Sequence, residues 1–297
     1  MNDTTQSLLR KMASAGDLHG IVRSMKALAI SNISQYEHAA QALTAYAHII
    51  ELGLGASFRQ IGPINPAFER RIKTTRNGFT AVVFGSDHGL VGPFNDIAVD
   101  YARQKIASIP GNPRILAIGD RAGNRLTDAG FTVSQTYPVP LSVSAITTLI
   151  GQILYDNEAV RQTDVSYEMH VFYNRPESVT EYKPASQQVL PFDQAMRRQW
   201  MSIEWPTQMP PDLMGDAVMT ASALIREFLF VSLFKACALS LASENASRLA
   251  AMQRADKNIE ELLQHLSGVY NHLRQQEIDD DLSDIISGYE AQTSRAD

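Results

Sequence analysis

Apolar positions near the start of the chain follow a heptad pattern. They fall at alternating steps of four and three residues: Leu18, Val22, Met25, Ala29, Asn32, Tyr36, Ala39, Leu43, Tyr46 and Ile50. This spacing keeps one stripe of a long helix against a partner helix. Gly53 and Gly55 predict the end of this helix, and Asp17 is a candidate N-cap that would separate a short first segment. We therefore predict an N-terminal coiled-coil helix within residues 1–58.

A second helical pattern occupies the end of the chain, within residues 210–292. Pro210 and Pro211 precede it, and Asp212 is the predicted N-cap. Its seam follows the same alternating steps: Ala255, Ile259, Leu262, Leu266, Val269 and Leu273. Beyond a polar run that starts at Arg274, apolar residues resume out of phase at Ile278, Leu282, Ile285, Ile286 and Tyr289. This phase shift indicates that the last turns meet a partner other than the first helix.

Between these helices, short β-rich runs alternate with helical stretches. Strands are predicted at residues 80–84, 114–118, 131–136 and 166–173, an edge strand at 180–190, and helices at 95–108, 121–129 and 144–156. Such alternation favours a Rossmann-like α/β domain with a mostly parallel sheet, here within residues 78–192. Helices as long as the terminal two cannot bury their seams inside so small a domain. We therefore predict a long antiparallel coiled coil of the N- and C-terminal helices with an inserted α/β domain.

The turn Gly85 to Asn95, with the sequence GSDHGLVGPFN, is the first candidate for chemistry because it follows a strand and opens a helix. A phosphate-binding turn is one interpretation, yet its glycines fit neither G-x-G-x-x-G nor G-x-x-x-x-G-K-[ST]. The spacing favours a tight structural turn in which Ser86 and Asp87 cap backbone amides.

Composition narrows the classes of function. A net charge of -6 disfavours a nucleic-acid partner. The seven histidines show no H-E-x-x-H spacing, and the acidic run after Arg274 lacks the central glycine of a calcium loop, so we expect no metal and no cofactor. The single cysteine, Cys237, lies in a small apolar run that favours a buried structural thiol. No set of Ser, His and Asp residues can be assembled into a catalytic triad from the sequence, so no catalytic residue is assigned.

The sequence also predicts no membrane span and no secretory signal. The N-terminus lacks an apolar core region, and charged residues interrupt the most apolar run, from Leu224 to Leu241.

Three segments resemble a known family, the gamma subunits of F-type ATP synthases. The stretch SLASENASRLAAMQRADKNIEELLQHLSGVYNHLRQQEIDDDLSDIISGYEA is similar to the C-terminal helix of that family, and SDHGLVGPFN is similar to its SDRGLCGGFN turn. IVRSMKALAISNI resembles the family's ITKAMKMVAASKM more loosely. The chain departs where His88 replaces an arginine, Pro93 replaces a glycine, and Asp279 and Asp281 replace threonine and glutamate. We hypothesise a divergent bacterial member, from an additional ATPase system.

The resemblance implies a non-catalytic central rotor shaft that couples ion flow through the membrane sector to ATP synthesis or hydrolysis in the alpha-beta ring. It implies alpha, beta, epsilon and the membrane c-ring as partners, at the cytoplasmic face of the bacterial inner membrane. Arg274 and Gln275 would form a polar latch with beta, and Ile285 and Ile286 would meet an apolar sleeve. The alternative is a small-molecule-binding α/β protein with coiled-coil dimerisation arms, which ligand-dependent stabilisation of the isolated chain would favour.

Two further predictions concern the foot and the register of the shaft. We place the foot, which meets epsilon or the c-ring, at Asp87 and His88 of the glycine turn together with Arg197, Arg198, Trp200 and Trp205 of the segment 195–205. That segment is equally compatible with a local core. Asn32, the polar residue on the seam, is predicted to fix the register of the helix pair.

Overall fold

The computed structural model describes residues 4–62, 78–163, 168–178, 181–192, 194–209, 211 and 216–293. Two long helices, α1 (Thr5–Ile61) and α7 (Ala217–Thr293), flank a five-stranded sheet and the shorter helices in the sequence. The chain divides into two compact units. One joins residues 1–28 to 250–297, and the other comprises residues 29–249.

Helix α1 is longer at both ends than the sequence predicts. It runs through Asp17 without a break, so the separate first segment is wrong. It also continues through Gly53 and Gly55 to Ile61, so these glycines do not end the helix. Gly55 serves a different purpose: a Cβ at this position would lie 2.3 Å from the carbonyl oxygen of Trp200. The glycine allows another segment to approach the backbone of α1 closely.

One flank of the predicted seam of α1 is confirmed, whereas the second flank is half-buried at Met25, Asn32 and Ala39 and exposed at its two ends. Val22, Ala29, Tyr36 and Ile50 are buried, as predicted, with Leu43 half-buried between them. Leu18 and Tyr46, which were assigned to the second flank, are 55% and 41% exposed. The observed second flank instead includes Ile33, Ala40 and Leu54. Apolar residues occur on both sides of the stripe formed by Val22, Ala29, Tyr36 and Ile50, so the sequence pattern does not show which side packs against the partner helix.

The sheet has the order β3-β2-β1-β4-β5, and its first four strands in this order are parallel neighbours. The strands are β1 (Gly78–Phe84), β2 (Asn112–Ile118), β3 (Val133–Tyr137), β4 (Glu168–Pro176) and β5 (Tyr182–Leu190). Strand β5 pairs antiparallel with β4 at the edge. Helices α3 (Phe94–Ile106), α4 (Asp120–Asp128) and α5 (Val143–Thr163) connect the parallel strands. The predicted Rossmann-like alternation of strands and helices is confirmed, and the bounds of the strands and helices differ from the predicted ones by a few residues.

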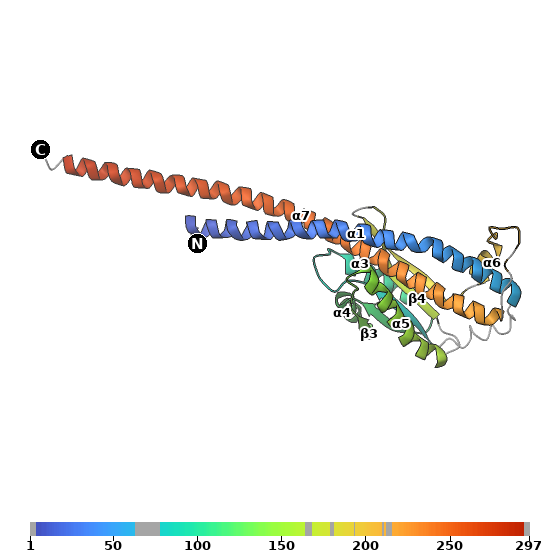
Figure 1. The fold of residues 1–297 in the computed structure, drawn as a ribbon. Helices are drawn as coiled ribbons and strands as arrows, with labels where there is room; N and C mark the ends of the chain where they lie inside the picture. The colour runs from blue at the N-terminus through green and yellow to red at the C-terminus, as the bar shows by residue number, and fades with distance from the viewer. Residues whose placement is uncertain are drawn as a thin grey trace. The chain divides into compact units, whose positions relative to one another are not determined.

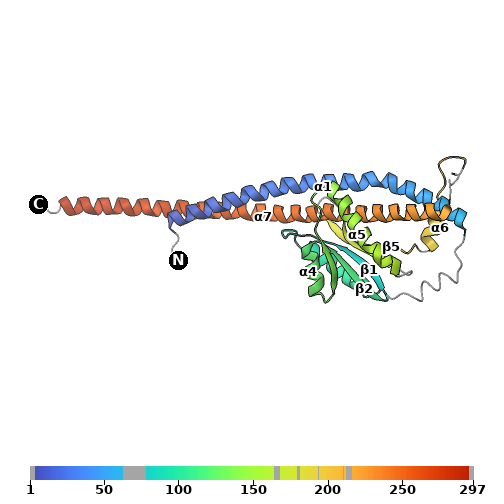
Figure 2. The same ribbon diagram turned by 60° about the horizontal axis from the view of Figure 1, so that its bottom comes forward.

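The two faces of the sheet have separate cores. Alternate residues of β1 such as Ala81 and Val83 pack with α3 and α4 on one face. Val82 and Phe84 point to the other face, where α5 and α7 cover the sheet (Figure 1). In this unit α1 lies along α7 on the side away from the sheet (Figure 2). Because α7 is enclosed by α1 and by the sheet, it is apolar on nearly all sides here.

This apolar character explains why α7 contains one stretch that is long and apolar enough to cross a membrane by length and composition alone. Of the residues in that stretch, 33% are buried in the described fold. A buried core helix passes the same test, so the stretch is weak evidence for a membrane span.

A short helix, α6 (Gln194–Ser202), was not predicted. Trp200 anchors it, because its ring lies 4.9 Å from that of Phe192 and 5.0 Å from that of Phe228. Arg59 near the end of α1 donates hydrogen bonds to the carbonyl oxygens of Met201 and Ile203, which satisfies the C-terminal end of α6.

Candidate functional site: a polar network around α7

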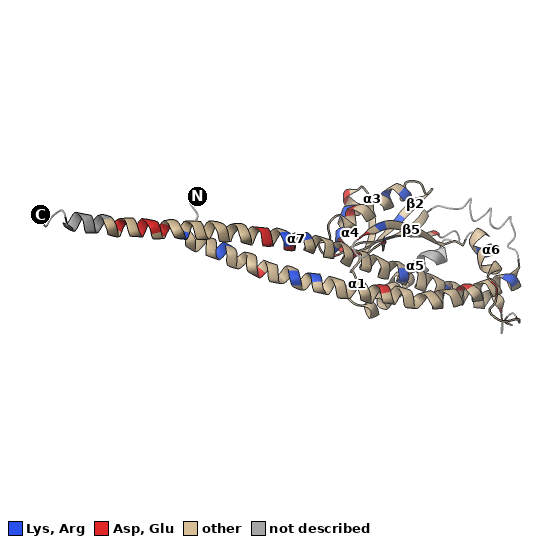
Figure 3. Ribbon diagram, turned by 90° about the horizontal axis from the view of Figure 1, so that it is seen from above, with Lys and Arg blue, Asp and Glu red and all other residues tan. Residues whose placement is uncertain are grey.

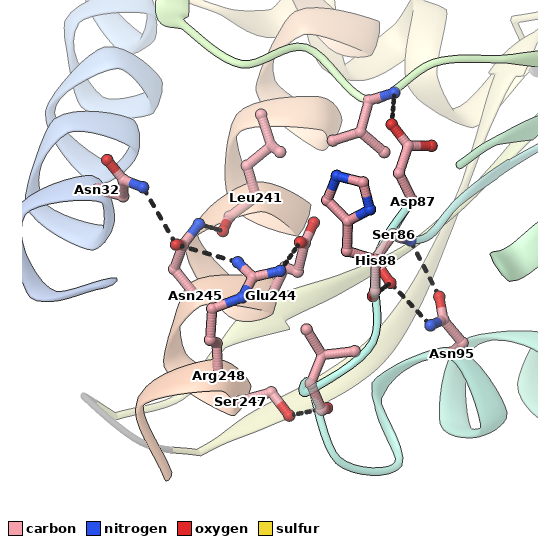
Figure 4. A network of polar contacts seen from close by, with 12 residues as sticks. Asn32, Ser86, Asp87, His88, Asn95, Leu241, Glu244, Asn245, Ser247 and Arg248 are labelled. Atoms are coloured by element: carbon pink, nitrogen blue, oxygen red, sulfur yellow. Dashed lines mark hydrogen bonds and ion pairs between the residues drawn. The ribbon is translucent and has the colours of Figure 1, made fainter. Parts of the chain in front are cut away.

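A polar turn interrupts the apolar core part of α7. Ser243, Glu244, Asn245 and Ser247 are all buried there, and Arg248 completes the turn. Burying such groups is costly unless they find partners, so their contacts determine how neighbouring elements are placed. Figure 4 shows that they meet α1 on one side and the turn after β1 on the other.

Asn32 on α1 is the partner on the first side. Its Nδ2 donates to Oδ1 of Asn245 at 3.3 Å, and the same oxygen accepts from Nη1 of Arg248 at 3.3 Å. Nδ2 of Asn245 donates to the carbonyl oxygen of Leu241 at 2.8 Å, which holds its amide in one orientation. A shift by one helical turn would separate the two asparagines, so this pair agrees with the predicted role of Asn32 in the register.

Glu244 forms the charged centre of the network. Its Oε1 accepts from Nη2 of Arg248 at 2.6 Å, whereas its buried Oε2 has no hydrogen-bond partner among the described residues. Burial raises the pKa of Glu244, and the nearby Arg248 opposes this shift only in part. Burial likewise raises the pKa of the Cys237 thiol, seven residues earlier on the same helix face, which agrees with the predicted structural thiol.

On the other side the serines of the turn bind the α/β domain. Ser243 donates to the carbonyl oxygen of Asn174 in β4 at 3.1 Å, and Ser247 donates to the carbonyl oxygen of Val91. The hydroxyl of Tyr182 in β5 lies 3.1 Å from that of Ser247. The end of β4, the adjoining start of β5 and the turn after β1 are therefore fixed to α7 by directional contacts as well as by apolar packing.

The glycine turn itself is filled by its own side chains. Oδ1 of Asn95 accepts from the backbone amide of Ser86 at 3.0 Å, and Nδ2 of Asn95 donates to Oγ of Ser86 at 2.8 Å. The carboxylate of Asp87 accepts from the amides of Asp120 at 3.0 Å and Val139 at 2.9 Å, beyond the ends of β2 and β3. The predicted tight structural turn is confirmed, and Asp87 caps backbone amides as predicted. Ser86 does not, because its hydroxyl donates to the carbonyl oxygen of His88 and accepts from Asn95.

The two parts of the predicted foot are not brought together. The glycine turn contacts α7 at Ser247, whereas α6 contacts it at Phe228. Nineteen positions separate these two residues in the sequence, roughly 28 Å along a helix. His88 is exposed on the first surface, and Arg198 is exposed on the second.

Within the second surface, Arg197 and Trp200 belong to the local core. Trp200 is 3% exposed, and the guanidinium of Arg197 lies 4.4 Å from the centre of the Phe58 ring. Such stacking stabilises both groups when they are shielded from water. Trp205 is half-buried. Arg198 and Trp205 thus remain the foot residues of this segment that are accessible to a partner.

In the other unit, the predicted tip residues are exposed. Arg274 and Gln275 lie on the surface of α7, and Ile285 and Ile286 are 69% and 58% exposed. The last described contact with α1 is the hydrogen bond from Thr5 to Glu277, at 3.1 Å. The apolar residues that resume out of phase, Ile278, Leu282, Ile285 and Ile286, are 49% to 69% exposed.

The same unit holds a charged cluster that the sequence did not reveal. Asp256 on α7 accepts from His19 at 2.8 Å and from Lys26 at 2.6 Å, and these contacts, with that to Lys26 foremost, lower its pKa. Glu260 lies close enough to His19 and Asp256 to complete a set of metal-ligand atoms. Arg23 and Lys26 already neutralise the two carboxylates, however, so the cluster acts as an ion-pair clasp.

His19 and Lys26 occupy the second flank of the α1 seam, four residues after Ala15 and Val22. The pairs they make join residues more than 200 positions apart in the sequence. A polar residue at a seam position is the only sequence signal for such a clasp.

The two antiparallel terminal helices pack along each other, the α/β domain packs against α7, and the polar network links all three. A family model described as ATP synthase matches residues 4–292. The ATP synthase gamma chain of Desulforamulus reducens is 24% identical to this chain, and the alignment covers 96% of this chain and 98% of that relative. The ATP synthase gamma chain of Pelagibacter ubique is 25% identical, and the alignment covers 97% of this chain and 99% of that relative.

Solved structures agree on the fold. The rotor of the Euglena gracilis mitochondrial ATP synthase has a TM-score of 0.60 at 16% identity, covering 92% of this chain and 98% of that one. The chain belongs to the ATP synthase gamma-chain family. Gamma chains form the central stalk of ATP synthase and are not catalytic, since catalysis takes place in the beta subunits. The family assignment thus favours the shaft over the alternative of a ligand-binding protein with dimerisation arms.

Proposed function

We propose that this chain is the rotor shaft of a bacterial ATP synthase, bound peripherally at the cytoplasmic face of the inner membrane. It turns inside a ring of alpha and beta subunits and rests on epsilon and the membrane c-ring. The observation that carries the proposal is the match to the family over residues 4–292, together with an exposed apolar tip of α7 beyond Glu277. The titles of the similar structures describe a rotor, and an assembly of OSCP, F1 and c-ring.

The buried network suits a part that transmits torque. A shaft must not let α1 slide along α7, nor let the α/β domain turn around them. The Asn32 and Asn245 pair opposes sliding, and the hydrogen bonds of Ser243 and Ser247 oppose rotation of the domain. Because a helix pair presents different side chains in each direction, every subunit of a surrounding ring would meet a different surface and adopt a different conformation as the shaft turns.

The contacts with partners follow from exposure. We assign Arg274 and Gln275 to a latch with beta and place Ile285 and Ile286 in an apolar sleeve. An arginine fork can bind a carboxylate of beta through two parallel hydrogen bonds.

For the contact with epsilon or the c-ring, we assign His88 to one surface and Arg198 with Trp205 to the other. Asp87, Arg197 and Trp200 support these surfaces from inside, because the carboxylate of Asp87 binds two backbone amides and the other two side chains are buried.

Affinity purification of the tagged chain from its native membranes tests the proposal. We expect alpha, beta, epsilon and c subunits to copurify with the tagged chain in fixed ratios. A chain that purifies alone or as a dimer would count against the proposal. A nucleotide that raises the melting temperature of that isolated chain would then favour the ligand-binding alternative.

A further inference from the structure

One carboxylate oxygen of Glu244 is left unsatisfied by the polar network. The side chain is buried and its Oε1 accepts from Arg248, but its Oε2 has no hydrogen-bond partner among the described residues. Within seven residues on either side of Glu244, α7 carries no basic residue other than Arg248. Figure 3 shows how sparse lysine and arginine are along this part of the helix. A second positive group beside Oε2 would therefore stabilise the buried carboxylate.

The turn after β1 brings His88 to this carboxylate. Two contacts bracket the position of His88. The hydroxyl of Ser86 donates to the carbonyl oxygen of His88 at 2.9 Å, and Ser247 of α7 donates to the carbonyl oxygen of Val91. Ser247 lies three residues after Glu244, on the same face of α7. The turn is thus held against the helix face that carries Glu244.

The imidazole of His88 lies where it can act on Glu244. Figure 4 shows this ring between the side chains of Glu244 and Asp87. Burial raises the pKa of Glu244, Arg248 opposes this rise, Asp87 adds to it, and the positive charge of His88 lowers it. His88 is exposed and exchanges protons with water, whereas the carboxylate behind it is buried. The two side chains therefore couple an accessible titrating group to a buried one.

Other ionisable side chains at this junction come from α1, α4, α7, β5 and the turn itself. In the described part of the chain they are Tyr36, Asp120, Arg121, Tyr182, Cys237, Arg248 and Asp87. The arginines stay positive, because guanidinium groups keep their proton in proteins. Burial raises the pKa of Tyr36 and of the Cys237 thiol, which keeps both neutral. Histidine is the residue type whose charge ordinarily changes between about pH 5 and 8.

We propose that His88 and Glu244 form a proton-sensitive latch between the turn after β1 and α7. When His88 takes up a proton from water, its ring N–H donates a charge-assisted hydrogen bond to Oε2 of Glu244, and the α/β domain is held more tightly on α7. When the proton returns to water, the imidazole is neutral, and the carboxylate depends on Arg248 for compensation. A charge-assisted hydrogen bond is roughly twice as strong as a neutral one.

The sign of the pH dependence follows from where the proton is held. The folded chain keeps a proton on the pair at pH values where the unfolded chain has released it. The latch therefore stabilises the fold at mildly acidic pH, and this contribution is lost as pH rises through the histidine range. The family turn that this segment resembles has arginine at the position of His88, and arginine would keep the latch closed at any ordinary pH. The latch lies within one chain, so it does not depend on the proposed function.

Thermal unfolding of the full chain at about pH 6 and about pH 8.5 tests the latch. Tryptophan fluorescence follows it, because both tryptophans lie in the same unit as His88 and Glu244. The variant His88→Gln is uncharged at both pH values, and His88→Arg is positive at both. His48→Gln is the matched control, because it removes an exposed histidine of α1 in the same unit. Each His88 variant is compared with the wild type at the same pH, which cancels the titration of other groups.

At the lower pH we expect His88→Gln to melt about 3–6 °C below the wild type, and at the higher pH at the same temperature. His88→Arg should match the wild type at the lower pH and exceed it at the higher one, while His48→Gln should match it at both. In a Glu244→Gln background, His88→Gln should have no effect at either pH. A decrease for His88→Gln that is equal at both pH values, is absent, or persists in the Glu244→Gln background would overturn the latch. If Glu244→Gln does not fold, the pH profiles of the two His88 variants decide.

Discussion

Gly55 separates the effect of helix propensity from that of packing. In the interior of a helix, replacing glycine by alanine stabilises by about 1 kcal/mol. At Gly55 the added Cβ would lie 2.3 Å from the carbonyl oxygen and 2.9 Å from the carbonyl carbon of Trp200, which are backbone atoms of α6. An ordinary contact is at least 3.4 Å, so α6 would have to move by about 1 Å from α1.

That movement would disturb the stacking of Trp200 against Phe58, Phe192 and Phe228. Overpacking of this kind costs about 1–3 kcal/mol, and weakened aromatic contacts add to it, so we expect Gly55→Ala to destabilise by about 2 kcal/mol after the gain in propensity. Gly16 and Gly20 are matched controls, because a Cβ at either meets nothing within 4 Å. Gly16→Ala and Gly20→Ala should therefore stabilise by about 0.5–1 kcal/mol each.

Urea unfolding followed by tryptophan fluorescence measures the unit that contains Gly55, because both tryptophans of the chain, Trp200 and Trp205, lie in it. Circular dichroism follows the helices of the controls. The reasoning is refuted if Gly55→Ala unfolds at the same or a higher urea concentration than the wild type with unchanged fluorescence.

Four further outcomes are expected. Asn32→Ala should lower the free energy of unfolding by about 1 kcal/mol in urea titrations, since it removes a hydrogen bond inside the polar network. Burial raises the pKa of Glu244, so the native state should lose stability as pH rises from the ordinary glutamate pKa toward the raised pKa. Glu244→Gln should abolish this loss, which thermal melts over that pH range measure. Arg198→Glu should weaken binding to c-ring and epsilon in pull-downs with normal folding, whereas Arg197→Glu should lower the melting temperature, because only Arg197 is buried over an aromatic ring. Arg274→Lys should reduce ATP-driven pumping in vesicles without loss of assembly, and full pumping by this variant would disprove the latch.

The sequence predicted the elements that local patterns determine. Alternating β-rich and helical runs gave the sheet and its connecting helices, and heptad spacing gave α1 and α7. The ends of α1 were wrong because glycine marks both a helix end and a close approach, and only Trp200 shows that Gly55 belongs to the second kind. Helix α6 was missed because it is short, and tertiary packing of Met196, Trp200 and Met201 against the core stabilises it.

The polar network was visible only in part. Asn32 was identified because a polar residue on an apolar seam is conspicuous, but its partner Asn245 lies 213 positions away. The clasp around Asp256 also depends on pairs between distant segments, which no local pattern contains. The residues assigned to partner contacts stay predictions, because their roles depend on other subunits.

Single-molecule rotation is the most direct test of the claim that this chain is a shaft. Burial raises the pKa of the native Cys237 thiol, so a cysteine placed at the exposed position 128 on α4 can be labelled selectively at neutral pH. The labelled chain is assembled with alpha and beta subunits fixed to a surface, and a bead reports its orientation. We predict stepwise rotation of the bead in one direction that starts when ATP is added and stops when it is exhausted. ATP hydrolysis by the assembled complex with a stationary bead would contradict the account.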